Sequence, residues 1–133
     1  PTTTIPVLEA GQGAQYPGFI LTLRRAVWEG DTLGTYWLFS NNGANKVEYS
    51  DLFPYLSFKA ADSAGNTGEH AFAEPMWDDF EKTLPVLGAT LWPGQQAVDF
   101  ERWAFGPLSK GIQVTYSYTS GNKIYQAIWN TGR

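Results

Sequence analysis

The sequence has no cysteine, one histidine and one methionine among its 133 residues. The absence of cysteine excludes disulfide bonds, thiolate chemistry and cysteine-based zinc sites. A copper or zinc site would have to be built mostly from carboxylates, which these metals do not favour. We therefore expect neither a metal ion nor another cofactor, and we expect stability to come from the packing of the core.

Charged residues are also scarce, at 17%, and the formal net charge is −4. The basic residues are scattered, and Arg24-Arg25 is their only adjacent pair. No basic stripe is present to neutralise a run of phosphates, so we expect no nucleic-acid partner. The longest apolar run, residues 18–23, contains Thr22 and is far shorter than the roughly 20 residues needed to cross a bilayer. We expect a chain that does not span a membrane.

Aromatic residues are abundant, at 16%, and the chain also has 14 glycines and 8 prolines. This composition favours short strands joined by many turns. A chain of this length fits one domain with one core. We expect residues 1–15, which are rich in proline and glycine, to be a tether or linker, and residues 16–133 to form a single β-sandwich domain.

The first six residues, "PTTTIP", have the proline and threonine composition of a flexible tether. Such a tether often follows an export signal that has been removed. We therefore expect an exported protein that is found outside the cell or in the cell envelope.

Alternation of apolar and polar residues marks the strands. In "FILTLRRAVW", Phe19, Leu21 and Leu23 share one parity, and Arg25 interrupts the pattern where a bulge or the end of the strand would fit. Turn sequences follow at residues 41–43, 62–66 and 120–122, and the last of these joins two alternating segments into a predicted hairpin. About seven or eight strands result.

No amphipathic segment of helical length separates the strands, so parallel βαβ units are excluded. The spacing of the turns favours an all-β, two-sheet immunoglobulin-like β-sandwich. A jelly roll or a small closed barrel fits the same pattern, because alternation does not reveal strand order. The segment "EPMWDDFEKTL", residues 74–84, is predicted to be an irregular or short helical insert.

The order of strands and turns resembles that of exported bacterial immunoglobulin-like domains of unknown function. These are often lipoprotein-anchored, and their fold is grouped with a mycobacterial immunoprotective extracellular antigen under the telokin-like label. The matching stretches span about residues 19–129 and include "LFSNNGANKVEYSDL", "LSFKAADSAGN", "TLWPGQQAVDFERWAF" and "KGIQVTYSY". The resemblance implies export, a lipid anchor upstream and a binding or structural role. The chain departs from it in its many tryptophans and its longer insert around residues 76–87.

Two carboxylates, Asp99 and Glu101, have the same parity in a predicted strand, with Cα atoms about 7 Å apart. A retaining glycosidase needs two carboxyl groups about 5 Å apart, so a catalytic role is geometrically open. However, Val98 and Phe100 have the opposite parity and are the expected inward set. We therefore expect both acids on the solvent face of the strand. Trp103 shares their parity and could stack on a sugar or pack in the core.

The insert supplies the predicted binding residues. Trp77 and Trp92 lie beside loop signals, and together with Asp78, Asp79 and Phe80 they could form an exposed contact surface. The alternative is that these rings plug an open end of the sandwich. The acids of "WDDFE" could also begin a helix, and they lack the spacing of a calcium-binding loop.

Two further features have simple structural interpretations. The stretch from Asp62 to Asn66 could hold a cation through oxygen ligands, although a turn explains each of its residues. His70 is the only histidine, and no Gly-x-Ser-x-Gly motif accompanies it. We expect no catalytic residue.

The sequence thus predicts a non-enzymatic, exported β-sandwich module for cell-surface binding or structural interaction. Its partner would be a protein or a cell-envelope glycan, and the module would be a monomer or a weak dimer. The alternative is a small carbohydrate-binding or carbohydrate-active domain that uses exposed tryptophan and the Asp99/Glu101 pair.

Overall fold

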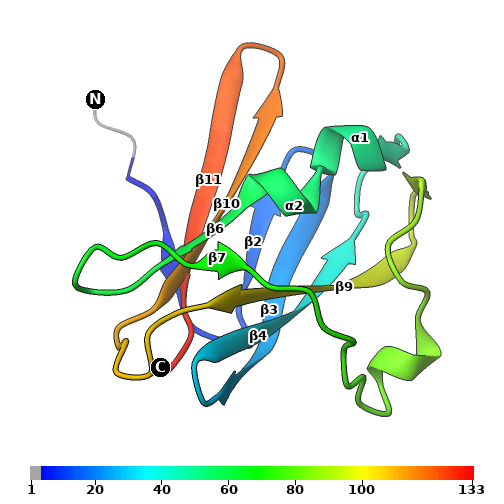
Figure 1. Cartoon of the computed structure of the whole chain (residues 1–133). Helices are drawn as coiled ribbons and strands as arrows, with labels where there is room; N and C mark the ends of the chain where they lie inside the picture. The colour runs from blue at the N-terminus through cyan, green and yellow to red at the C-terminus, as the bar shows by residue number, and fades with distance from the viewer. Residues whose placement is uncertain (1–3) are drawn as a thin grey trace.

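The computed structural model describes residues 4–133 of the chain and contains two main sheets and a small ribbon (Figure 1). The first sheet has the order β1 (Val7–Leu8), β11 (Lys123–Asn130), β10 (Gln113–Ser120), β6 (Phe58–Ala61). The second has the order β2 (Gly13–Tyr16), β3 (Phe19–Glu29), β4 (Thr32–Ser40), β9 (Gln96–Ala104), β7 (Glu69–His70). The ribbon pairs β5 (Val47–Glu48) with β8 (Thr90–Leu91). The helical segments are α1 (Tyr49–Leu52), α2 (Pro54–Ser57) and a 3₁₀ turn, η1 (Glu81–Thr83).

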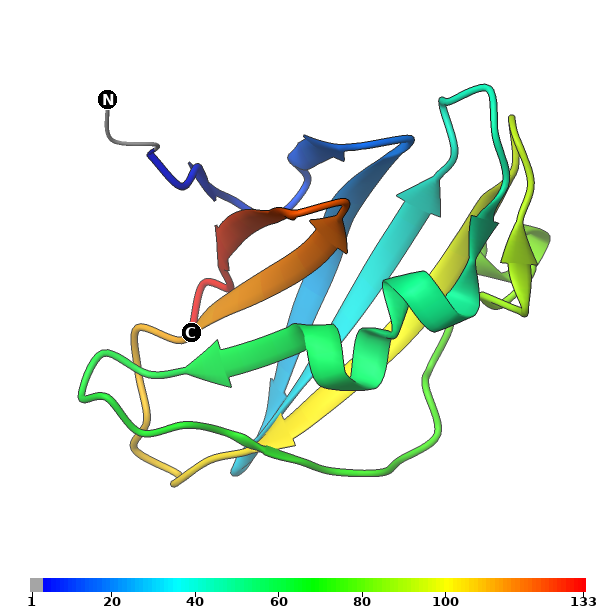
Figure 2. The same ribbon diagram turned by 90° about the horizontal axis from the view of Figure 1, so that it is seen from above.

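The two main sheets pack face to face, and the predicted all-β sandwich with a short helical insert is confirmed (Figure 2). Aromatic side chains fill the space between the sheets. Trp37 of β4 meets Trp129 of β11 edge to face at 5.0 Å between ring centroids, and Phe58 of β6 lies 4.5 Å from Trp37. All three rings are buried, so each removes a large apolar area from water. No helix among residues 4–133 is long and apolar enough to cross a bilayer.

Regular structure begins earlier than the expected boundary at residue 16. Strand β1 pairs in parallel with β11, and β2 pairs with β3 as an edge of the second sheet. Part of the predicted tether therefore belongs to the sandwich, because its short strands pair with β11 and with β3. Residues 1–3 of that tether lie outside the described residues.

The predicted bulge near Arg25 is confirmed, since the register of β3 against β4 shifts between Leu23 and Arg25. A bulge places successive side chains on one side of the strand. As a result both Arg24 and Arg25 reach the insert.

Helical turns occupy residues 49–57, although the alternation of apolar and polar residues near Tyr49 and from Tyr55 onward predicts extended chain. Phe53 links α1 to α2 with a positive φ of 34°, and its N–H donates to the carbonyl of Tyr49 at 2.8 Å. Pro54 stands at the first position of α2, where its missing N–H costs nothing. The two turns connect β5 to β6 and run along the side of the sandwich next to β9 (Figures 1 and 2).

The faces of β9 are the reverse of those predicted. Asp99 is paired with Trp37, whose side chain is in the core, and Trp103, of the same parity as Asp99, is also buried in the core. Phe100 instead lies on the outer face, under Tyr36 and Trp77. The reason is that the insert covers the outer face of β9, so the strand carries apolar side chains on both faces. Parity alone could not tell which face is inside.

Candidate binding pocket beside a buried acid pair

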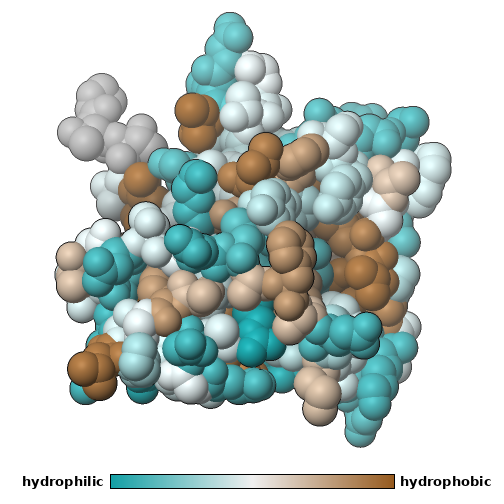
Figure 3. Space-filling view, viewed as in Figure 1, coloured by the Kyte–Doolittle hydropathy of each residue, from teal (hydrophilic) through white to brown (hydrophobic). Residues whose placement is uncertain are grey.

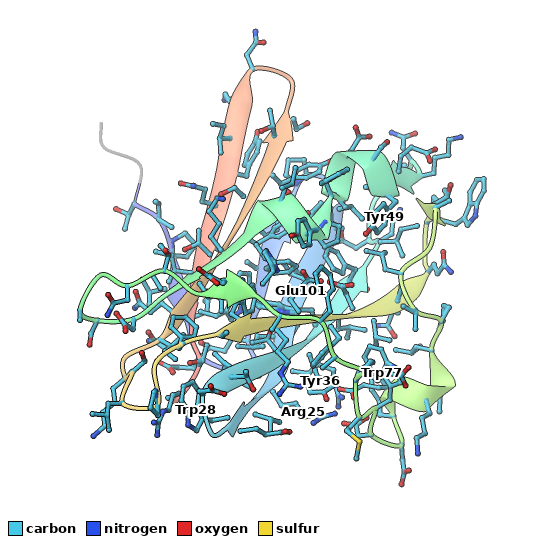
Figure 4. The ribbon with its side chains drawn as sticks, viewed as in Figure 1. Arg25, Trp28, Tyr36, Tyr49, Trp77 and Glu101 are labelled. Atoms are coloured by element: carbon cyan, nitrogen blue, oxygen red, sulfur yellow. The ribbon has the colours of Figure 1, made fainter. Side chains whose placement is uncertain are left out.

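The side chain of Glu101 points between the second sheet and the helical segment α1–α2 (Figure 4). Asp99 lies two residues earlier in β9, so its side chain leaves the same face of the strand. The Glu101 side chain is 11% exposed. Asp99 Oδ2 is shielded from solvent and has no hydrogen-bond partner among residues 4–133. The expectation that both acids lie on a solvated face is therefore wrong.

The two carboxyl groups are close enough to form a hydrogen bond when one of them carries a proton. Burial raises the pKa of both groups, and the pKa of Glu101 is raised further by the charge of Asp99. Two carboxylates in one poorly hydrated site cannot both ionise easily. Near neutral pH the pair therefore holds one proton and one negative charge between its members.

This negative charge has no cationic partner within the described chain. The nearest basic atom is His70 Nδ1, 4.0 Å from Glu101 Oε1. Burial lowers the pKa of His70, so the imidazole is neutral near pH 7. No lysine or arginine of residues 4–133 forms an ion pair with Asp99 or Glu101.

An aromatic stack borders the acid pair. The ring of Tyr55 in α2 stacks on His70 at 4.3 Å between centroids, and on Phe72 at 6.0 Å with an interplanar angle of 9°. Phe72 is 87% exposed and Tyr55 is 44% exposed. Figure 3 shows hydrophobic surface gathered on this side of the molecule, below α1 and α2.

Beside these rings lies a pocket of about 390 Å³. Its lining consists of Tyr55, residues 70–74 and residues 100–102. It therefore combines exposed ring surface with the accessible oxygen of Glu101, while Asp99 lies behind Glu101 in the interior. A pocket with mostly apolar walls and a few polar groups is the usual form of a small-ligand site.

The insert is attached to the outer face of the second sheet by a charged cluster of Arg24, Arg25, Asp78 and Glu81. The Glu81 side chain is completely buried, and it accepts from Arg24 Nη1 at 2.6 Å and from Arg25 Nη2 at 2.8 Å. Asp78 and Glu81 also accept hydrogen bonds from each other's backbone N–H, which is the arrangement of a capping box. The Arg25 guanidinium lies 3.6 Å above the ring centroid of Tyr36. These contacts stabilise the fold of the insert.

The structure separates the five predicted binding residues. Trp77 is half-buried against Tyr36, and Asp78 is ion-paired with Arg24 at 2.7 Å. Asp79 and Phe80 are exposed near η1. Trp92, 56% exposed, follows β8 and lies near Lys46 instead. A binding role for these five residues stays a prediction.

The turn at residues 62–66 is explained by its own hydrogen bonds. Asp62 Oδ1 accepts from the backbone N–H of Ala64 and of Asn66. Within residues 4–133 no group of three or more histidine and acidic side chains is arranged to hold a metal ion.

Sequence reasoning did not find the aromatic stack. The alternation around Tyr55 predicts a strand, whereas His70 and Phe72 lie in a segment with no clear period. Only the fold of α1–α2 brings Tyr55 over His70. One signal was present, because Trp103 shares the parity of Asp99 and Glu101. A tryptophan in that register favours an inward face, and the two acids must then point inward as well.

No family model matches the chain, and none of the curated proteins matches it in sequence. Solved structures do match it. The yjhA protein from Bacillus subtilis is 14% identical with a TM-score of 0.64, and the match covers 92% of this chain and 98% of that protein. An uncharacterized β-sandwich protein from Clostridium difficile 630 is 9% identical with a TM-score of 0.59, and the match covers 98% and 96%.

The chain therefore shares its β-sandwich fold with uncharacterized bacterial proteins, in agreement with that part of the resemblance found in the sequence. At these identities the likeness shows the fold alone. Export and lipid anchoring stay predictions.

Proposed function

We propose that the protein is a non-catalytic binding module of the bacterial cell envelope that holds a glycan in the pocket between Tyr55, Phe72 and Glu101. One observation carries the proposal: Phe72 is 87% exposed while its ring is held nearly parallel to that of Tyr55 at the mouth of the pocket. An apolar ring so fully presented to water, beside carboxyl groups, is suited to stack on the C–H face of a sugar.

The polar groups of the pocket complement this surface. Glu101 and Glu74 line it and can accept hydrogen bonds from sugar hydroxyls. The pocket volume of about 390 Å³ is within the range of small-ligand sites.

Binding is favoured over glycoside hydrolysis by the geometry of the acid pair. Retaining hydrolysis needs carboxyl groups about 5 Å apart, and inverting hydrolysis needs a still wider gap that holds a water molecule. Asp99 and Glu101 are instead within hydrogen-bonding reach of each other. Asp99 Oδ2 is also shielded.

Location in the envelope rests on the tether-like first residues and on the resemblance stated above. It is tested by expressing the natural gene and treating intact cells with protease. Loss of the protein from intact cells supports the location, and protection until the cells are lysed contradicts it.

The binding site is tested by NMR titration with three tetrasaccharides: the tetramers of N-acetylglucosamine and of glucosamine, and maltotetraose. We expect at least one to shift the amide signals of residues 70–74 and 100–102. Phe72→Ala should abolish this binding, whereas Leu108→Ala, which removes an equally exposed side chain elsewhere, should not.

Trp92→Ala tests the sequence-based alternative. Binding that is lost in Trp92→Ala and kept in Phe72→Ala would place the site at the insert. The absence of binding by all three sugars would contradict a glycan-binding role.

A further inference from the structure

Glu81 and the Asp99/Glu101 pair are neutralised differently. The Glu81 side chain is fully buried and bonds to both Arg24 and Arg25. The carboxyl groups of Asp99 and Glu101 are largely shielded from solvent as well, but among residues 4–133 the only basic atom within 4.0 Å of them belongs to the neutral His70. A buried negative charge without a partner is costly. A ligand that brings a positive charge to Glu101 would remove this cost.

The basic side chains at the rim of the pocket do not supply this positive charge to Glu101. Arg102 lines the pocket, but its guanidinium donates to Thr32 Oγ1 at 2.6 Å and lies 3.9 Å from Glu29. Lys59 is exposed and close enough to influence His70, yet it makes no ion pair with either buried acid. Glu74 adds a negative charge to the lining. The floor of the pocket therefore remains anionic.

The walls of the pocket favour an organic cation. Aromatic faces attract ammonium groups through the negative charge above the ring. Tyr55 and Phe72 present such faces to the pocket, and Glu101 lies on the same lining. A metal ion is less well served, because among residues 4–133 no three histidine or acidic side chains are arranged to hold one.

We propose that this pocket selects a glycan that carries a positively charged ammonium group, with the ammonium bound between Glu101 and the faces of Tyr55 and Phe72. The shielded Asp99 Oδ2, which has no partner, stabilises that position from behind. The inference rests on the glycan-binding role proposed above and adds the charge of the recognised group. A deacetylated amino sugar is the simplest ligand of this kind.

The test compares two ligands that differ only in the charged group, the tetramers of glucosamine and of N-acetylglucosamine. Their dissociation constants are measured by NMR titration at about pH 6.5, where most of the acid pair carries its negative charge and most amines of this type are still protonated. We expect the glucosamine tetramer to bind about tenfold more tightly. The double change Asp99→Asn, Glu101→Gln removes the negative charge of the pair. It should remove this preference and leave the weaker binding of the acetylated tetramer, because ring stacking persists. The matched change Glu69→Gln, at an exposed site outside the pocket lining, should keep the preference.

The outcomes separate the two proposals. Equal affinities, or tighter binding of the acetylated tetramer, overturn the ammonium inference and leave glycan binding in place. Binding of maltotetraose alone would likewise overturn the ammonium inference and leave glycan binding in place. If no sugar binds, both proposals are overturned. A preference for glucosamine that survives the double change Asp99→Asn, Glu101→Gln also overturns the inference, because the ammonium group would then be recognised elsewhere. The thermal unfolding of each variant is measured first, to confirm that it folds.

Discussion

Asp99 of β9 lies directly opposite Trp37 of β4 in the register of the second sheet. Trp37 is completely buried, so the pairing directs a carboxyl group toward the aromatic interior. The indole N–H of Trp37 donates to Thr35 Oγ1 at 2.7 Å and not to Asp99, which leaves Asp99 Oδ2 without a partner. This arrangement costs stability in the free protein, and a ligand that pairs with the acids would remove that cost.

The acid pair should make folding stability depend on pH. A carboxyl whose pKa is raised in the folded state favours folding most below its unfolded pKa, which is about 4.3 for glutamate. Stability is then lost as the pH rises from there through the folded pKa of Glu101, about 9. We expect Glu101→Gln to raise the free energy of unfolding at pH 8 by about 1–3 kcal/mol and to change it little near pH 4. Urea unfolding at both pH values measures this. An identical pH profile in the wild type and the variant would contradict the shared-proton state.

Glu81 should be essential for stability because its buried charge is held by two arginines. Removing one partner from a buried ion pair leaves uncompensated charge and typically costs about 3–5 kcal/mol. We expect a loss at the lower end of this range for Glu81→Ala, because Arg24 and Arg25 lose their buried acceptor and keep only the partly exposed Asp78 as an acidic partner. The exposed neighbour Asp79 is the control, and Asp79→Ala should stay within about 0.5 kcal/mol of wild type. Similar unfolding midpoints for the two variants would show that the cluster does not hold the insert.

Features of the fold that depend on local periodicity could be predicted from the sequence, and features that depend on distant contacts could not. Alternation located the long strands, and Arg25 located the bulge, because both depend on local periodicity. The orientation of β9 could not be obtained in this way, because the insert covers its outer face and Phe100 is needed there. The pocket depends on Tyr55 meeting His70 across 15 positions of the chain, and no local pattern encodes that contact.

Gly68 lies just before β7, the strand that carries His70. The close packing around Gly68 leaves no space for a side chain. A Cβ at Gly68 would lie 2.7 Å from the Phe105 ring and 2.8 Å from Trp103 Cβ. We expect Gly68→Ala to destabilise the protein by about 1–3 kcal/mol through overpacking. At Gly88 the nearest atom is 3.9 Å away, so Gly88→Ala should change stability little. Thermal unfolding of both variants measures the difference, and equal stabilities would contradict the tight contact.

Phe72 should contribute little to stability despite its size. Its side chain is 87% exposed, so the folded Phe72→Ala variant buries almost as much apolar area as the wild type. We expect a change of less than about 0.5 kcal/mol in the free energy of unfolding, measured in urea. A loss of several kcal/mol would instead indicate that the ring packs into the fold and is not presented to a ligand.

The most direct measurement is an NMR titration of the side-chain carboxyl carbons of Asp99 and Glu101 in the free protein. Burial and mutual repulsion predict that one carboxyl of the pair still holds its proton at neutral pH and releases it well above the ordinary range. Two carboxyl groups that both ionise near their ordinary values of about 4 would mean that the pair is hydrated, and the anionic pocket floor would no longer explain ligand choice.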